Sequence, residues 1–181
     1  MSHSLDFVGL NEKLFLLRHF IAGNKEFSRR ERHYQGTQAN PSHEWDEYAD
    51  RLRYIVSNDL IEIAAKFRVI QDAAVGQVDG EYLQDLDSAC IGINVIGTVL
   101  EGEVLLTLRE ACNKILHAKN FELTFQNARS AQPRHPYSYW NGICRLSGSH
   151  SRKNWRIALD VYRWADVMDY FLEDLSENLP W

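Results

Sequence analysis

The chain has 181 residues, with 20 lysines and arginines against 25 aspartates and glutamates, and a formal net charge of -5 at pH 7. This length suits a single domain with its own hydrophobic core. Hydrophobic residues make up 45% of the chain and charged residues 25%, which is typical of globular proteins and excludes extensive disorder. The negative charge excludes a protein that coats DNA through a strongly basic surface, but it is compatible with a local basic site for RNA or a nucleotide.

Cysteine usage and the absence of long apolar runs indicate the cytoplasm. Cys90, Cys112 and Cys144 are far apart and odd in number, so they predict neither a zinc site nor a disulfide framework. Residues 1–6 contain no basic stretch followed by an apolar one, as a secretory signal would. No apolar run approaches the roughly 18 residues of a membrane-spanning helix. We therefore expect three reduced thiols, a cytoplasmic location and no contact with a membrane.

The first predicted helix runs from about Leu5 to Phe20 and is expected to end at Gly23 and Asn24. Its apolar residues recur at three- and four-residue steps, which places them on one buried stripe: Phe7, Leu10, Leu14, Leu17 and Ile21. The polar segment Lys25–Ser42 contains several arginines and is interpreted as a long surface loop, either a solvated linker or a functional segment.

Ser42 is predicted to cap a second, long helix. The apolar stripe of this helix is Trp45, Tyr48, Leu52, Val56, Leu60, Ile63, Phe67 and Ile70. Asp59 and Glu62 also form a capping pattern, so a break near Ser57 stays open. In the segment Asp79–Gly102, glycines interrupt the apolar run and weaken a helix prediction, and we expect part helix and part loop there.

Thr107 and Glu110 form a T-x-x-E capping box that opens a helix from Leu108 to His117. The spacing of apolar residues then changes from helical to alternating, which predicts three strands. These strands are expected at Phe121–Phe125, Tyr137–Leu146 and Trp155–Leu159. A last helix is expected from about Asp160 to Glu173, and the residues on its buried face are Val161, Trp164, Met168, Phe171 and Leu175.

The predicted fold class is α+β, predominantly α. We expect one domain over residues 1–181, built as a helical bundle with a three-stranded antiparallel β-meander at about 120–160, before the C-terminal helix. The aromatic residues of this region could stack bases, but their strand and helix spacing favours a core: Tyr137, Tyr139, Trp140, Trp155 and Trp164.

The candidate site lies on the helix Leu108–His117. Arg109, Asn113 and His117 follow one another at four-residue steps, so they share one face of the helix. Histidine can act as a general acid or base near neutral pH, and arginine can bind a phosphate through two hydrogen bonds. The alternative is that His117 only interacts with the helix dipole and that Asn113 bonds to a neighbouring loop.

The run Cys112–His117 resembles the R-N-x-x-x-H signature of HEPN-domain proteins. Asn113 and His117 match the signature, whereas Cys112 stands in the position of the arginine, and Arg109 is the nearest arginine. These proteins are helical bundles, and many are metal-independent RNases of toxin, antiphage-defence and CRISPR systems that act as dimers. In them, the arginine and histidine of two protomers meet at the dimer interface. On this resemblance, the substitution Cys112→Arg would rebuild the family's spacing.

The resemblance implies a homodimer that pairs the Leu108–His117 helices around an RNA-cleaving site. His117 would be the general acid or base, Asn113 would orient it or the phosphate, and Arg109, supported by Lys114, would stabilise phosphate charge. The alternative function is a non-catalytic HEPN-like binding or dimerisation module. This module would hold a protein or nucleic-acid partner through the same surface or through the segment Arg29–His33.

Neither function calls for a cofactor. His43 and Glu47 lie one helical turn apart and could bind a metal together with a neighbouring acid. Acidic first turns are common on helix surfaces, however, so we expect no metal site.

Overall fold

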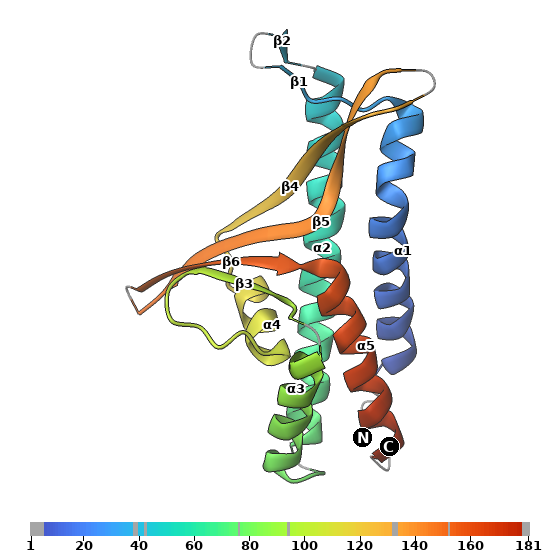
Figure 1. Cartoon of the computed structure of the whole chain (residues 1–181). Helices are drawn as coiled ribbons and strands as arrows, with labels where there is room; N and C mark the ends of the chain where they lie inside the picture. The colour runs from blue at the N-terminus through green and yellow to red at the C-terminus, as the bar shows by residue number, and fades with distance from the viewer. Residues whose placement is uncertain are drawn as a thin grey trace.

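The computed structural model describes residues 6–37, 40–41, 43–75, 77–93, 95–131, 134–151 and 153–178, and within them the fold is α+β and mostly helical (Figure 1). The helices are α1 (Phe7–Glu31), α2 (His43–Ala74), α3 (Gly80–Ile93), α4 (Leu108–Leu116) and α5 (Val161–Asn178). Four strands form one antiparallel sheet: β3 (Gly97–Glu101), β4 (Asn120–Arg129), β5 (Pro136–His150) and β6 (Lys153–Asp160). The short strands β1 (Gly36–Thr37) and β2 (Asn40–Pro41) form a separate hairpin.

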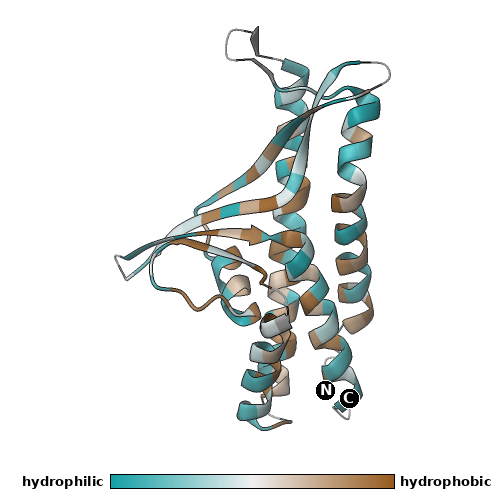
Figure 2. Cartoon of the chain, viewed as in Figure 1, coloured by the Kyte–Doolittle hydropathy of each residue, from teal (hydrophilic) through white to brown (hydrophobic). Residues whose placement is uncertain are grey.

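The long helices α1 and α2 run side by side, and α5 packs against α1. The apolar stripe predicted for α2 is buried, apart from the half-buried Tyr48. The helix continues through Ser57 without a break, and Asp59 pairs with Lys13 of α1 instead of starting a new helix. Ser42, the predicted cap, lies outside the described residues. Brown, hydrophobic residues gather in Figure 2 where α2, α3, α4 and the sheet adjoin.

Helix α1 is longer than predicted, because it passes Gly23 and Asn24 and ends only at Glu31. Asn24 is buried and makes two tertiary hydrogen bonds. Its Nδ2 donates to the Tyr48 hydroxyl (3.0 Å), and its Oδ1 accepts from the backbone N–H of Trp140 (2.9 Å). These contacts stabilise a helical backbone that local propensity does not favour. The predicted loop Lys25–Ser42 is therefore wrong for residues 25–31.

The sheet has four strands rather than the three of the predicted meander. Its order is β3-β6-β5-β4, so β4, β5 and β6 form the expected meander and β3 is an additional edge strand that precedes α4. At Gly97 an added Cβ would lie 2.5 Å from the carbonyl oxygen of Ala158. The glycine permits this close strand pairing. Gly97 argued correctly against a helix at this position, but the sequence did not predict the strand that forms there.

The course of β5 links the two ends of the sheet. Its first residues pack along α1, and its later residues pair with β6. Gly142, at φ +84°, lies just before the residue at which pairing with β6 begins, Ile143. Such a backbone conformation suits glycine, which has no Cβ to clash. No helix among the described residues is both long and apolar enough to cross a membrane.

Candidate functional site

The helix α4 begins where the capping box predicts. The Thr107 hydroxyl accepts a hydrogen bond from the backbone N–H of Glu110 (3.1 Å), and His117 forms the C-terminal cap. A second group also caps the helix, because the buried carboxylate of Asp87 in α3 accepts from the backbone N–H of Leu108 (2.8 Å). Burial raises the pKa of Asp87 despite these hydrogen bonds. The N-cap Thr107 and the Asp87 side chain of α3 thus fix the start of α4.

A pocket of about 550 Å³ lies between α4 and the β5–β6 hairpin. Three of the predicted site residues, Asn113, Lys114 and His117, line it together. The remaining lining residues are Glu110, Ser149, His150 and Trp155. The pocket therefore contains two histidines from separate elements, and both are exposed to solvent.

Hydrogen bonds and ion pairs fix the polar residues of α4 that line this pocket. The Arg68 Nη1 on α2 donates to Asn113 Oδ1 (2.8 Å), and Asn113 Nδ2 donates to the Glu110 carboxylate (3.1 Å). Lys114 Nζ lies 2.8 Å from the same carboxylate and 4.8 Å from the centre of the Trp155 ring. The Asn113 amide and the Lys114 ammonium are therefore held in defined positions.

Glu110 is kept ionised by this network. Burial raises the pKa of its carboxyl group, but hydrogen bonds from Lys114 and Asn113 and the nearby His150 outweigh burial and lower it. A carboxylate with a lowered pKa is a poor proton donor, so Glu110 orients its neighbours rather than supplying an acid.

Arg109 lies outside the residues that line the pocket. Its Nη2 pairs with Asp72 of α2 at 2.8 Å, and Arg68 pairs with the same carboxylate at 3.5 Å. Burial raises the pKa of Asp72, but the two arginines outweigh it and lower the pKa. In this arrangement Arg109 connects α4 to α2, and the arginine that contacts Asn113 is Arg68.

Cys112 is fully buried, so the position that the signature assigns to arginine faces the hydrophobic core. Burial raises the pKa of its thiol well above the ordinary value. Cys90 and Cys144 are also free and buried, in agreement with the prediction of unpaired thiols.

Sequence reasoning missed His150 and Arg68 as neighbours of the site. His150 ends β5, beyond the predicted strand Tyr137–Leu146, and it reaches the pocket because β5 and β6 stay paired as far as His150 and Lys153. Most of the aromatic cluster is buried as expected, with Tyr139 half-buried. Trp155 also lines the pocket, which its strand spacing did not indicate.

Within the described residues, no three histidines, cysteines or acids lie close enough together to hold a metal ion. The predicted pair His43 and Glu47 lies 3.6 Å apart on the surface of α2. No known family model, no curated protein and no solved structure matches the chain.

Proposed function

We propose that the pocket between α4 and the β5–β6 hairpin binds RNA and cleaves it without a metal ion. The observation that carries the proposal is that His117 and His150, from two different elements, line the same pocket as Lys114. Metal-independent cleavage of RNA needs one group to accept the proton of the 2′-hydroxyl and another to protonate the departing 5′-oxygen. Imidazole groups suit both tasks near neutral pH.

The reaction is an internal transfer of the phosphodiester. The 2′-oxygen loses its proton to one histidine and bonds to phosphorus. The bond from phosphorus to the 5′-oxygen breaks, and the other histidine supplies the proton. Lys114, held by Glu110 and Trp155, would supply positive charge to the pentavalent phosphate, and Asn113, which retains a second N–H, would orient it.

The resemblance to HEPN proteins supports the roles of Asn113 and His117. In HEPN proteins a second protomer completes the site, whereas here every group that we propose comes from one protomer. His150 is supplied by β5, and Arg68 of α2 acts through Asn113 as a positioning residue. The chemistry therefore does not require two protomers. A cytoplasmic role in a toxin or antiphage-defence system stays part of this proposal.

The second candidate is a non-catalytic module that holds RNA or a protein in the same pocket. Two observations favour it: Cys112 replaces the family's arginine and is buried, and Arg109 is engaged by Asp72. Such a module would keep the binding surface and lack turnover.

The first prediction separates the two functions. His117→Ala and His150→Ala should each lower the rate of cleavage of a single-stranded RNA by about a hundredfold to ten-thousandfold, because each removes a proton-transfer group. A chelator should leave the rate unchanged. An RNA with a 2′-deoxy nucleotide at the cut position should bind and not be cleaved.

His43→Ala is the matched control, since His43 is an exposed histidine at the start of α2. It should have no effect on cleavage, and melting curves should show that all three variants fold. Binding of RNA by the wild-type protein without cleavage would favour the binding module. An absence of both binding and cleavage would reject the proposal.

A further inference from the structure

The outward face of α1 carries an unusual number of exposed large apolar residues. Leu10, Leu14 and Leu17 face the core. Exposed on other sides of the helix are Val8 (73%), Phe15 (52%), Leu16 (62%), Phe20 (38%) and Phe27 (52%). Monomeric proteins rarely expose contiguous apolar patches of this kind without using them.

Four positions of this face form a stripe, which we call the α1 stripe: Leu16, Phe20, Gly23 and Phe27. Their steps of four, three and four residues are those of a helix that packs against another helix. Gly23 has no atom within 4 Å of the place where a Cβ would lie. The middle of the stripe is therefore a shallow site that could receive a large side chain.

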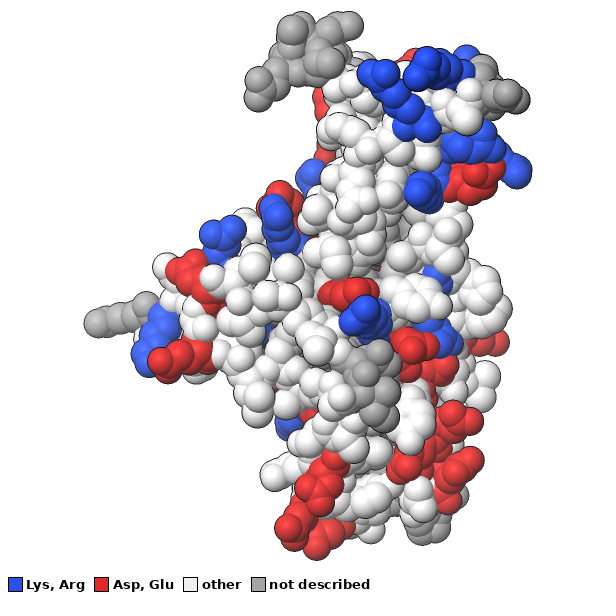
Figure 3. Space-filling model, viewed as in Figure 1, with Lys and Arg blue, Asp and Glu red and all other residues white. Residues whose placement is uncertain are grey.

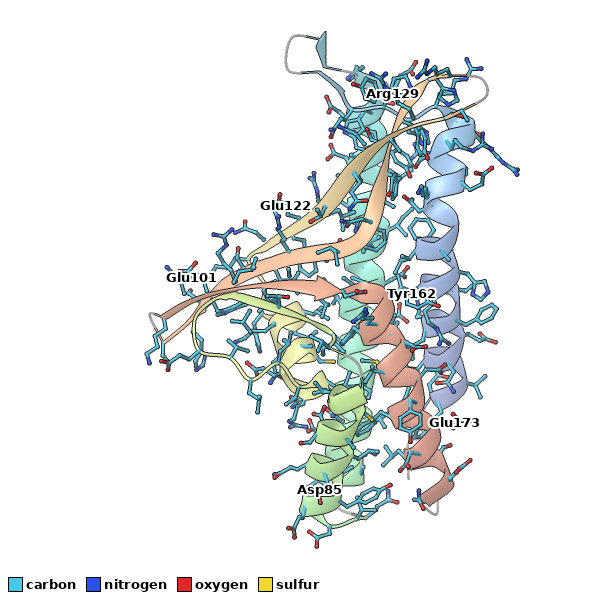
Figure 4. All side chains as sticks on the ribbon, in the orientation of Figure 1. Asp85, Glu101, Glu122, Arg129, Tyr162 and Glu173 are labelled. Atoms are coloured by element: carbon cyan, nitrogen blue, oxygen red, sulfur yellow. The ribbon has the colours of Figure 1, made fainter. Side chains whose placement is uncertain are left out.

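Charge is distributed unevenly on the face of the molecule that Figure 3 shows. The space-filling view shows Lys and Arg at the end where α1 finishes and β4 meets β5, and Asp and Glu at the end where α5 finishes (Figure 3). In the stick view, Arg129 lies at the first end and Glu173 near the second (Figure 4). On α1 itself, exposed Glu12 precedes the stripe and exposed Arg30 follows it.

We propose that the α1 stripe binds the α1 stripe of a second copy of this chain, with the two helices antiparallel about a two-fold axis. A parallel pair would bring like charges together at both ends. An antiparallel pair places the basic end of each copy level with the acidic end of the other. Complementary charge of this kind selects orientation in protein interfaces.

The sequence of the stripe specifies the register of this pair. With the axis between Ile21 and Ala22, Phe20 packs over the partner's Gly23 and Leu16 faces the partner's Phe27. The same axis brings Glu12 close to the partner's Arg30. Apolar packing, the glycine depression and the charged pair thus agree on one arrangement.

This dimer differs from the one implied by the HEPN resemblance, which would pair the α4 helices. The outward residues of α4 include Arg109 and His117, and its one large exposed apolar side chain is Leu116. The α1 face is more apolar, and its use leaves the pocket of α4 open. The inference does not depend on the proposed RNA cleavage.

Sedimentation velocity at micromolar concentrations should give twice the chain mass of 21.0 kDa. Phe20→Glu and Phe27→Glu should each weaken association at least tenfold, because they place a charge in the apolar stripe. Leu105→Glu is the matched control: among the described residues Leu105 is the most exposed large apolar one, it lies outside α1, and it should tolerate the change without loss of the dimer. A monomeric wild-type protein, or equal effects of all three variants, would overturn the proposal.

Disulfide cross-linking tests the orientation, and the three native thiols are buried and do not interfere. Glu12→Cys alone should not cross-link, whereas a mixture of Glu12→Cys and Arg30→Cys should form a mixed dimer. Self-linking of Glu12→Cys would indicate a parallel pair, and self-linking of His117→Cys without a Glu12–Arg30 product would indicate α4 pairing. Either result would overturn the arrangement.

Discussion

Cys112 illustrates how the direction of a single side chain decides what a sequence motif can do. The residue lies between Ala111 and Asn113, yet it is fully buried while Asn113 reaches the pocket. A helix turns by about 100° per residue, so neighbours in a motif face different environments. In this chain the arginine position of the signature belongs to the core, and the arginine beside Asn113 comes from α2.

Cys112→Arg should therefore destabilise the protein rather than rebuild an RNase site. An uncompensated charge in the core costs about 3–5 kcal/mol. Cys112→Ala should cost much less, since it leaves only a small cavity. Urea denaturation followed by circular dichroism measures both. Native stability of Cys112→Arg would show that this side chain can leave the core.

The ring of His33 stacks on the ring of Tyr48, with the two ring centroids 3.7 Å apart. Its Nδ1 is buried without a hydrogen-bond partner among the described residues. Burial lowers the pKa of His33 from its ordinary value of 6.5, against the opposing influence of Glu31 and Glu44. As pH falls below about 6.5, the unfolded chain therefore takes up the proton first, and the free energy of unfolding decreases.

His33→Phe keeps an aromatic ring on Tyr48 and removes the titration. The variant should lose less stability than the wild type between pH 7.5 and pH 5, as measured by urea denaturation at each pH. His43→Phe, at an exposed histidine, is the control and should follow the wild type. Identical pH profiles for His33→Phe and the wild type would contradict the lowered pKa of His33.

At the scale of elements, the extension of α1 depends on contacts with α2 and β5. Gly23 and Asn24 are adjacent in sequence, and local rules treat both as signs of a helix end. In the structure they differ, because Gly23 faces open space while the Asn24 side chain bonds to Tyr48 and Trp140. Neighbouring substitutions should therefore have opposite effects.

Asn24→Ala should destabilise the protein by about 1–3 kcal/mol, because it leaves buried polar groups without their partner. Gly23→Ala should stabilise it by about 0.5–1 kcal/mol, because alanine restricts the unfolded chain and has room in the helix. Thermal or urea unfolding at low protein concentration measures both without a contribution from association. Destabilisation by both variants would mean that the helix is strained at this point.

At the scale of the whole molecule, periodicity predicted the elements whose stability is local. The sequence predicts four of these features: the buried stripe of α2, the capped start of α4, the alternation in β4 and the buried face of α5. The end of α1 and the strand β3 were not predicted, since they depend on Asn24 and Gly97 meeting residues far along the chain.

The same distinction applies to the candidate site. Asn113, Lys114 and His117 share one helix, so their spacing was enough to place them together. His150 and Arg68 reach the site through strand register and helix packing, which a single sequence does not reveal. The pocket is thus lined by three elements, α4, β5 and β6, and the motif describes only α4.

The position of β3 also affects the order in which the protein can fold. β4, β5 and β6 follow one another and pair with short connections, so their contacts are local and quick to form. β3 precedes these strands in the sequence, but its Gly97 pairs with Leu159 at the end of β6. Closing that long loop costs chain entropy and must await the rest of the sheet. The residues that line the pocket, on α4, β5 and β6, all lie inside that loop. The pocket can therefore assemble before β3 pairs, and the β3 edge of the sheet would be the last part to form.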